Sequence, residues 1–114
     1  RRRPPRRLIP AVQRLLRDYI DTHLGQPITV ARLSVIAGLT PHELLPAARA
    51  SFGTTPAQYV IEQRLRRARW LLRTTAADIT RIALDTGFAS HAHLSATFRA
   101  RLGVSPKEFR ATGA

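Results

Sequence analysis

The feature that most constrains this chain is an internal repeat. The segment 29–59 aligns with the segment 78–109 once a single residue is inserted in the second copy. The ten matched pairs are Thr29 with Asp78, Arg32 with Arg81, Leu33 with Ile82, Gly38 with Gly87, Thr40 with Ser90, Leu44 with Leu94, Arg49 with Arg99, Gly53 with Gly103, Pro56 with Pro106 and Tyr59 with Phe109. Chance would align a glycine or two, but not this whole register. The chain is therefore predicted to contain two similar structural units.

Each copy of the repeat has the sequence pattern of a short helix, a glycine turn and a longer helix. A residue with a side-chain oxygen precedes each helix, where it can accept hydrogen bonds from the first free amides. Gly38 and Gly87 follow the short helices, at positions where the chain often turns left-handed. In the first copy, Thr40, Pro41 and Glu43 form the pattern of a capping box. This order is typical of a helix-turn-helix, whose second helix enters the DNA major groove.

Two more helices are predicted outside the aligned short and long helices. Before the first copy, Pro10 suits a first turn and Gly25 suits the end of a helix. Its apolar stripe comprises Leu8, Val12, Leu15, Leu16, Tyr19 and Ile20. Between the copies, Thr55 is expected to cap a helix of about 18 residues, roughly 27 Å long, that joins the two units as a rigid strut. Its apolar stripe comprises Ile61, Leu65, Ala68 and Leu72.

The composition restricts both the partners and the chemistry of the chain. It carries 19 Lys+Arg and 7 Asp+Glu, a formal net charge of +12, and the opening RRRPPRR supplies only part of that excess. Such a charge favours polyanions, nucleic acid above all. The absence of cysteine excludes disulfides and zinc-thiolate sites. No apolar run is long enough for a membrane span, and no leader for export is expected.

Specific residues of the second copy and of the helix before it form a family signature. They are Arg64, Ala68, Leu71, Leu72, Ile82, Ala83, Gly87, Phe88, Ser90, Phe98, Arg99, Gly103, Val104, Ser105, Pro106, Phe109 and Arg110. Over about residues 8–111, the chain resembles the AraC/XylS-type transcription regulators. The resemblance implies an all-α fold of about seven helices, with two helix-turn-helix subdomains joined by one long helix.

The repeat and the resemblance together predict the organisation of the chain. We expect residues 1–7 to form a basic linker or arm, and residues 8–114 to form the DNA-binding domain. Within that domain, 8–54 is the first helix-turn-helix unit, 55–74 is the linking helix and 75–114 is the second unit. The resemblance also implies an absent N-terminal domain that binds an effector or dimerises.

The longer helix of the second copy is expected to read DNA bases. Helical spacing from the Ser90 cap points His91, Ala92, Ser95, Ala96 and Arg99 toward the groove, and Leu94 and Phe98 toward the core. By resemblance, the first four are the positions through which the family reads bases. Many members have arginine in place of Ala96, so a guanine contact is expected to be missing. His91 is expected to donate to a guanine or a phosphate, although it also fits a solvated first-turn residue.

The corresponding face of the first copy carries His42, Leu45, Pro46 and Arg49. Pro46 stands inside the predicted helix, where it removes a backbone hydrogen bond, so a kink or a shortened helix is expected. It also stands where the family often has a base-reading arginine. This unit is therefore expected to contribute phosphate anchoring and shape recognition. The alternative is that Pro46 is tolerated without any effect on specificity.

Residues outside the two reading faces are expected either to contact phosphates or to have no role in binding DNA or metal. The predicted phosphate contacts are Arg32, Thr40, Arg64, Arg81, Ser90 and Arg101. Arg64 also fits a structural arginine that holds the two units together. His91 and His93 are two residues apart on a helix and point in different directions, so no metal site is expected. Trp70 lies off the apolar stripe and is expected either to cover the joint between the units or to contact a protein partner.

The predicted function is sequence-specific binding of double-stranded promoter DNA to regulate transcription initiation. Two recognition helices would enter successive major grooves, in the cytoplasm of a bacterium and on its nucleoid. RNA polymerase is a further expected partner, and no cofactor, metal or enzymatic activity is expected because no catalytic motif is present. Two alternatives stay open, a helical module for acidic protein partners and a non-specific nucleic-acid binder.

Overall fold

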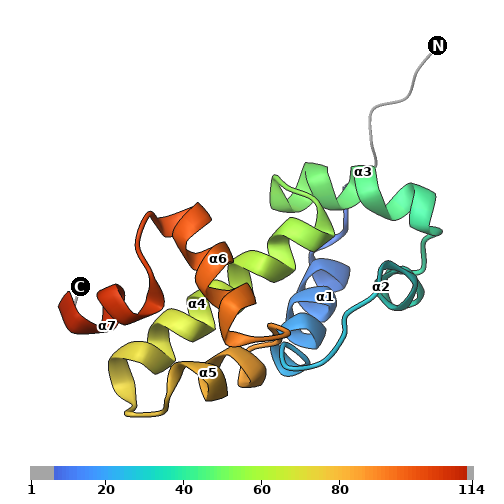
Figure 1. The fold of residues 1–114 in the computed structure, drawn as a ribbon. Helices are drawn as coiled ribbons and strands as arrows, with labels where there is room; N and C mark the ends of the chain where they lie inside the picture. The colour runs from blue at the N-terminus through green and yellow to red at the C-terminus, as the bar shows by residue number, and fades with distance from the viewer. Residues whose placement is uncertain (1–6, 113–114) are drawn as a thin grey trace. The chain divides into compact units, whose positions relative to one another are not determined.

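The computed structural model describes residues 7–112, so the arm predicted for residues 1–7 lies outside the described residues except for Arg7. Seven α-helices and no strand occur in this part of the chain (Figure 1). They are α1 (Pro10–Thr22), α2 (Val30–Ala37), α3 (Pro41–Phe52), α4 (Pro56–Thr74), α5 (Ile79–Asp85), α6 (His91–Leu102) and α7 (Pro106–Thr112). The predicted all-α fold and its number of helices are confirmed.

The helices form two compact units, and the division between them falls inside α4. The first unit contains α1, α2, α3 and the beginning of α4 as far as Ile61. The second unit contains the rest of α4 from Glu62 onward, together with α5, α6 and α7. The short segment Leu24–Gln26, which follows α1 in the sequence, also belongs to the second unit. The long helix therefore supplies core residues to each unit in turn.

The caps and turns of the repeat form where the sequence places them. Thr29 accepts from the amide of Arg32 at 3.1 Å, and Asp78 accepts from the amide of Arg81 at 2.8 Å. In the first unit, Thr40 and Glu43 bond reciprocally as the predicted capping box. Gly38 has a φ of 69°, so its left-handed turn connects α2 to α3 without the strain that a side chain would bring.

The core of the first unit is built from the faces that α1, α2 and α3 turn toward one another. Its buried apolar residues include Leu16, Ile20, Leu33, Leu44, Ala47 and Ala48. The predicted stripe of α1 is wrong at Leu15, which is 55% exposed, because the neighbouring Leu16 occupies the buried direction. Gly25 is also not the end of that helix, since α1 ends at Thr22 with His23 as its cap.

The proline inside α3 does not shorten this helix. α3 has 12 residues, as many as α6, so the expectation of a shortened recognition helix is wrong. Pro46 is exposed, and the bond that it removes would have gone to the carbonyl of His42 in the first turn. Water can reach that part of the surface, and the capping box stabilises the same turn. The helix therefore continues through the proline.

The core of the second unit forms beneath α6. Leu94 and Phe98 of α6 are completely buried, and Phe98 meets Phe109 of α7 edge to face, with ring centroids 5.4 Å apart. The remaining buried apolar residues of this core include Leu65, Ala68, Leu72, Ile82, Ala83 and Phe88. The stripe predicted along the linking helix is thus buried at its three positions in this unit.

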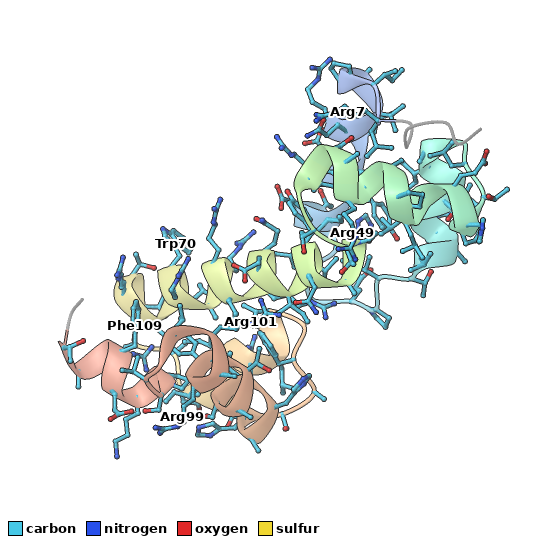
Figure 2. All side chains as sticks on the ribbon, turned by 90° about the horizontal axis from the view of Figure 1, so that it is seen from above. Arg7, Arg49, Trp70, Arg99, Arg101 and Phe109 are labelled. Atoms are coloured by element: carbon cyan, nitrogen blue, oxygen red, sulfur yellow. The ribbon has the colours of Figure 1, made fainter. Side chains whose placement is uncertain are left out.

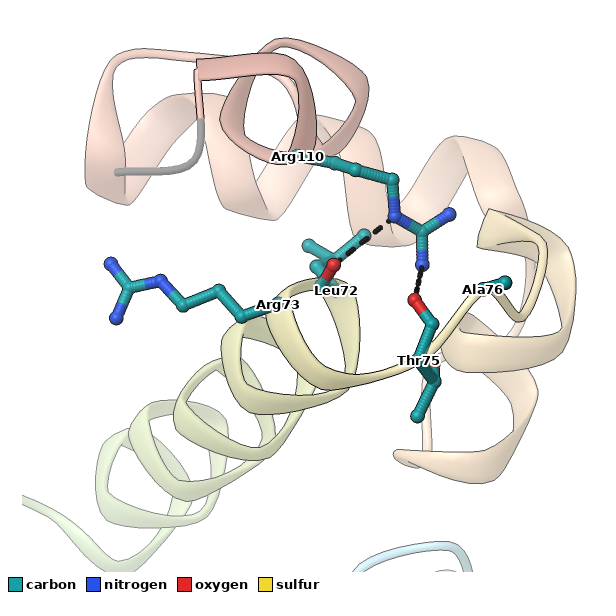
Figure 3. A pocket seen from close by; sticks show the side chains of 5 residues that line it. All are labelled: Leu72, Arg73, Thr75, Ala76 and Arg110. Carbon is teal, nitrogen blue, oxygen red and sulfur yellow. Dashed lines mark hydrogen bonds between the residues drawn. The ribbon is translucent and has the colours of Figure 1, made fainter.

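Two arginines hold backbone carbonyls within the second unit. Arg110 of α7 donates from Nε to the Leu72 carbonyl at 3.2 Å and from Nη2 to the Thr75 carbonyl at 3.2 Å (Figure 3). These carbonyls lie at the C-terminal end of α4, where helix carbonyls lack intrahelical partners. Arg64 of α4 donates in the same way, from Nε to Leu24 at 3.1 Å and from Nη2 to Gln26 at 3.0 Å.

Gly87 allows the close packing around Arg64. Its φ is 94°, and a Cβ there would overlap the Leu24 carbonyl oxygen and stand 2.5 Å from Arg64 Nε. Gly103, in the same unit, also has a positive φ of 79°, but a Cβ there would meet nothing within 4 Å. The two glycines therefore share the backbone requirement and differ in the space around them.

This difference gives a stability prediction. Gly103→Ala should lower the free energy of unfolding by about 1–2 kcal/mol, the cost of a left-handed backbone. Gly87→Ala should lower it by about 1–3 kcal/mol more, because the Leu24–Arg64 contact must also move. Urea unfolding followed by circular dichroism measures both values. Equal losses in the two variants would contradict the packing described for Gly87.

Candidate nucleic-acid interface

The helix α6 presents the residues predicted to read bases on the surface of the second unit. Ser90 Oγ accepts from the amide of His93 at 3.0 Å and starts the helix. Because Leu94 and Phe98 are buried, the opposite side of the helix must face outward. That side carries the exposed His91, Ala92, Ala96 and Arg99, with the half-buried Ser95 among them. The predicted reading face is therefore accessible, and its contact with DNA stays a prediction.

The helix α3 presents the equivalent face in the first unit. Leu44, Ala47 and Ala48 are buried, and they orient the helix. The four predicted residues on the other side, His42, Leu45, Pro46 and Arg49, are all exposed. The leucine is 45% exposed, so this face combines an accessible apolar side chain and a proline ring with one arginine. It offers fewer hydrogen-bond donors to base edges than α6 does.

A residue that the sequence argument did not assign to DNA, His93, lies in the first turn of α6. Its Nδ1 accepts from the amide of Ala89 at 3.2 Å, and its ring meets Phe88 edge to face. Since a backbone amide only donates, Nδ1 is the acceptor and Nε2 carries the hydrogen. The exposed ring is thus held as a donor in the first turn of α6. From the sequence, the spacing of His91 and His93 was considered only for metal binding, so His93 was not predicted as a donor to DNA.

No group of three potential metal-binding side chains occurs within residues 7–112.

The two arginines predicted as equivalent phosphate anchors differ in their surroundings. Both Arg32 and Arg81 are exposed in the short helix of their unit. Arg81 Nε lies 3.1 Å from Asp85 Oδ2, an ion pair one helical turn away. The first copy has Ile36 at the position of Asp85, so it offers no carboxylate there. We therefore expect Arg32 to meet DNA with its full charge and Arg81 with part of its charge compensated.

The predicted anchor Arg101 and the predicted reading-face residue Arg99 both have protein partners. Arg101 Nη1 donates to Glu62 Oε1 at 2.7 Å, which ties α6 to α4. Arg99 Nη2 lies 3.5 Å from Glu108, whose carboxylate also accepts from the Ser105 amide at 2.8 Å. The hydrogen bonds from Ser105 lower the pKa of Glu108 below its ordinary value, so this carboxylate stays charged beside the arginine. These side chains can bind phosphate only by sharing their charge with a carboxylate.

Among the predicted phosphate anchors, Arg64 donates two hydrogen bonds to the protein backbone. Two of its donors are taken by the carbonyls of Leu24 and Gln26, and burial lowers the pKa of its guanidinium. These bonds fit the alternative that the arginine is structural. They lie within the second unit, since the segment Leu24–Gln26 belongs to it.

Among residues 7–112, no helix is both long enough and apolar enough to cross a membrane.

Comparison with known proteins agrees with this geometry. The helix-turn-helix domain family matches residues 33–112. A transcriptional regulator from Chromobacterium violaceum, described among AraC-type DNA-binding domain-containing proteins, has a solved structure with a TM-score of 0.84. It is 30% identical, and the match covers 91% of this chain and 93% of that one. The DNA-binding domain of AdpA, solved in complex with a target DNA, has a TM-score of 0.83 at 29% identity, with coverage of 89% and 90%.

Curated regulators match over the same region but are much longer. The probable transcriptional regulator LumQ of Photobacterium leiognathi is 33% identical over 96 residues, which are 84% of this chain and 39% of that protein. The probable thc operon regulatory protein of Rhodococcus erythropolis is 34% identical over 107 residues, 91% of this chain and 32% of that protein. The chain thus spans well under half the length of these relatives. From its repeated helix-turn-helix units and these matches, the chain belongs to the AraC/XylS-type family of DNA-binding domains.

Proposed function

We propose that this chain binds double-stranded promoter DNA in a sequence-specific way and thereby regulates the initiation of transcription. The proposal depends on one arrangement that occurs in both units: a helix with a side-chain N-cap follows a glycine turn and exposes one side. The net charge of +12 favours DNA as the partner of these exposed faces. The solved complex of the AdpA domain with its target DNA supports the proposal. In the proposed complex of this chain with DNA, α3 and α6 would enter successive major grooves.

The roles proposed for the reading faces follow from their chemistry. His91 and His93 offer ring N–H donors to guanine or phosphate acceptors, and Ser95 offers a hydroxyl that pairs with any base. Ala92 and Ala96 have only methyl groups, which suit the methyl of thymine. Arg99 lies further along α6 and is proposed to reach the backbone, as is Arg49 on α3.

The two recognition helices are proposed to read DNA unequally. On α3, Leu45 and Pro46 replace donors with apolar surface, so His42 is left as the principal polar group for base edges. The helix still has its N-terminal amides capped at Thr40 and its exposed Arg49, which suit phosphate binding. We therefore assign most of the base discrimination to α6, and mainly anchoring and shape recognition to α3.

The wider setting of this activity is part of the same proposal. Because the relatives are longer regulators, we propose that an N-terminal effector-binding or dimerisation domain and RNA polymerase are partners of the complete protein. The family consists of transcription regulators rather than enzymes, and we assign the chain no catalytic role. Such a protein would act in the bacterial cytoplasm, on the nucleoid.

A titration against two duplexes tests the proposed function. A duplex enriched from a random pool should bind at least about 10³-fold more tightly than a scrambled duplex of the same length and composition. If six to eight phosphates are contacted, log K should fall with log salt concentration at a slope of roughly −5 to −7. Fluorescence anisotropy of labelled duplexes measures both quantities.

The same titration separates the alternatives. Equal affinity for the two duplexes would make the chain a non-specific nucleic-acid binder. No binding at low salt would contradict a DNA interface altogether and favour a module for acidic protein partners.

The unequal anchors give a second prediction. Arg32→Ala should weaken binding to the enriched and scrambled duplexes alike and reduce the salt slope by about 1, because phosphates carry no sequence information. Arg81→Ala should act in the same direction but more weakly, since Asp85 already compensates part of its charge. As the matched control, Asp85→Asn should strengthen binding to both duplexes. A loss confined to the enriched duplex would contradict the phosphate role.

A further inference from the structure

A large aromatic side chain stands exposed on the part of α4 that belongs to the second unit. Trp70 is 56% exposed, although burying an indole contributes more than burying almost any other side chain. The neighbouring stripe positions of the helix, Ala68 and Leu72, are buried, so α4 already has its core contacts without this residue. The tryptophan is therefore not required to close the core of the unit.

Trp70 lines a groove on the surface of the second unit, with a volume of about 450 Å³. Apolar surface is added by Leu102 at the end of α6, Val104 in the turn that follows and Phe109 of α7. Arg66, Arg69, Arg73 and Thr74 of α4 complete the lining. The groove, which we call the Trp70 groove, thus combines an apolar floor with a row of arginines.

The carboxylates of the second unit are engaged by residues that do not line the Trp70 groove. Glu62 pairs with Arg101, Asp85 pairs with Arg81, and Glu108 lies beside Arg99. The fourth carboxylate, at residue 78, caps α5.

Two of the groove arginines have no internal contact for their charge. Within residues 7–112, neither Arg66 nor Arg69 forms an ion pair or a hydrogen bond through its side chain. Arg73 lies over the ring of Phe109, with its guanidinium carbon 4.8 Å from the ring centroid. The groove therefore has positive charge to offer to a ligand, held beside aromatic surface.

The Trp70 groove lies away from the face of α6 that is proposed to read DNA. Figure 2 shows Trp70 on one side of α4 and Arg99 beyond α6, so that both helices lie between them. Phosphates bind through charge and hydrogen-bond donors, and apolar contacts with valine, leucine and phenylalanine do not stabilise them. An acidic segment with apolar side chains uses both parts of the groove.

We propose that the Trp70 groove docks an acidic peptide segment of a protein partner, with an apolar side chain of that segment against Trp70, Val104 and Phe109 and its carboxylates on Arg66 and Arg69. The arginines would steer the acidic segment to the groove, and the buried apolar contact would hold it there.

The tryptophan itself reports on the proposed contact, because it is the only one in the chain. The probe is a synthetic twelve-residue peptide of aspartate and glutamate with two leucines four positions apart and no aromatic residue. Its titration into the full chain should shift the Trp70 emission to shorter wavelength in a saturable way. A peptide with glutamine and asparagine in place of the acidic residues is the ligand control and should give no saturable shift.

Charge-reversal variants locate the contact. Arg66→Glu with Arg69→Glu should weaken binding of the acidic peptide by about fivefold or more, as expected when two charge pairs at the surface are lost. The matched control is Arg67→Glu on the same helix, which is exposed but does not line the groove, and it should weaken binding by less than about twofold. Unchanged circular dichroism of each variant shows that the fold is kept.

Three results would overturn the proposal. The first is no saturable emission shift with the acidic peptide, and the second is equal weakening in the groove variant and in Arg67→Glu. The third is that the enriched DNA duplex shifts the Trp70 emission and displaces the peptide, which would assign the groove to the DNA interface. Because DNA binding is measured separately, failure of this proposal leaves the proposed DNA-binding function standing.

Discussion

The rotation of each recognition helix about its own axis is set by the few apolar side chains that it buries. In α6, Leu94 and Phe98 are completely buried, and in α3 the same is true of Leu44. A helix pinned in this way can expose only the residues on its other side. The side-chain caps at Thr40 and Ser90 then fix where each helix begins, and so which residues stand in its first turn. The position of the proposed reading face thus follows from core packing.

A second constraint holds the second unit together around α4. Arg64 and Arg110 each donate two hydrogen bonds to backbone carbonyls, at Leu24 and Gln26 for one and at Leu72 and Thr75 for the other. A planar guanidinium suits this task, because its donors diverge in one fixed plane. Two donors of each arginine are thereby used within the protein rather than offered to a ligand. Among the arginines left at the surface are those of the proposed DNA interface and those of the Trp70 groove.

Much of this architecture could be predicted from the sequence, because it depends on local chemistry. The repeat, the caps at Thr29 and Asp78 and the turn at Gly38 are set by a few neighbouring residues, and all are confirmed. The long helix was predicted at about 18 residues and has 19, because a capped start and a helical apolar stripe are both local signals.

The features that the sequence did not predict depend on contacts between distant residues. Leu15 and Leu16 both fit a helical stripe, and only the packing of α1 within its unit decides that Leu16 is the buried one. The bonds of Arg64 reach a segment some forty positions earlier, which no local pattern indicates. The shortening of α3 expected from Pro46 is wrong, because the carbonyl that loses its hydrogen bond lies in an exposed first turn, where the loss can be tolerated. Which residues touch DNA depends on a partner as well, and it stays a prediction.

A base-by-base substitution scan of the enriched duplex measures whether the two capped helices read DNA unequally. The scan is run on the original chain and on the His91→Ala and His42→Ala variants, so that each sensitive block of bases can be assigned to α6 or α3. We expect two blocks of sensitive bases about one helical turn apart. Substitutions should cost about 1–3 kcal/mol of binding free energy each in the block assigned to α6, and less in the block assigned to α3. A single sensitive block, or a more sensitive block assigned to α3, would contradict it.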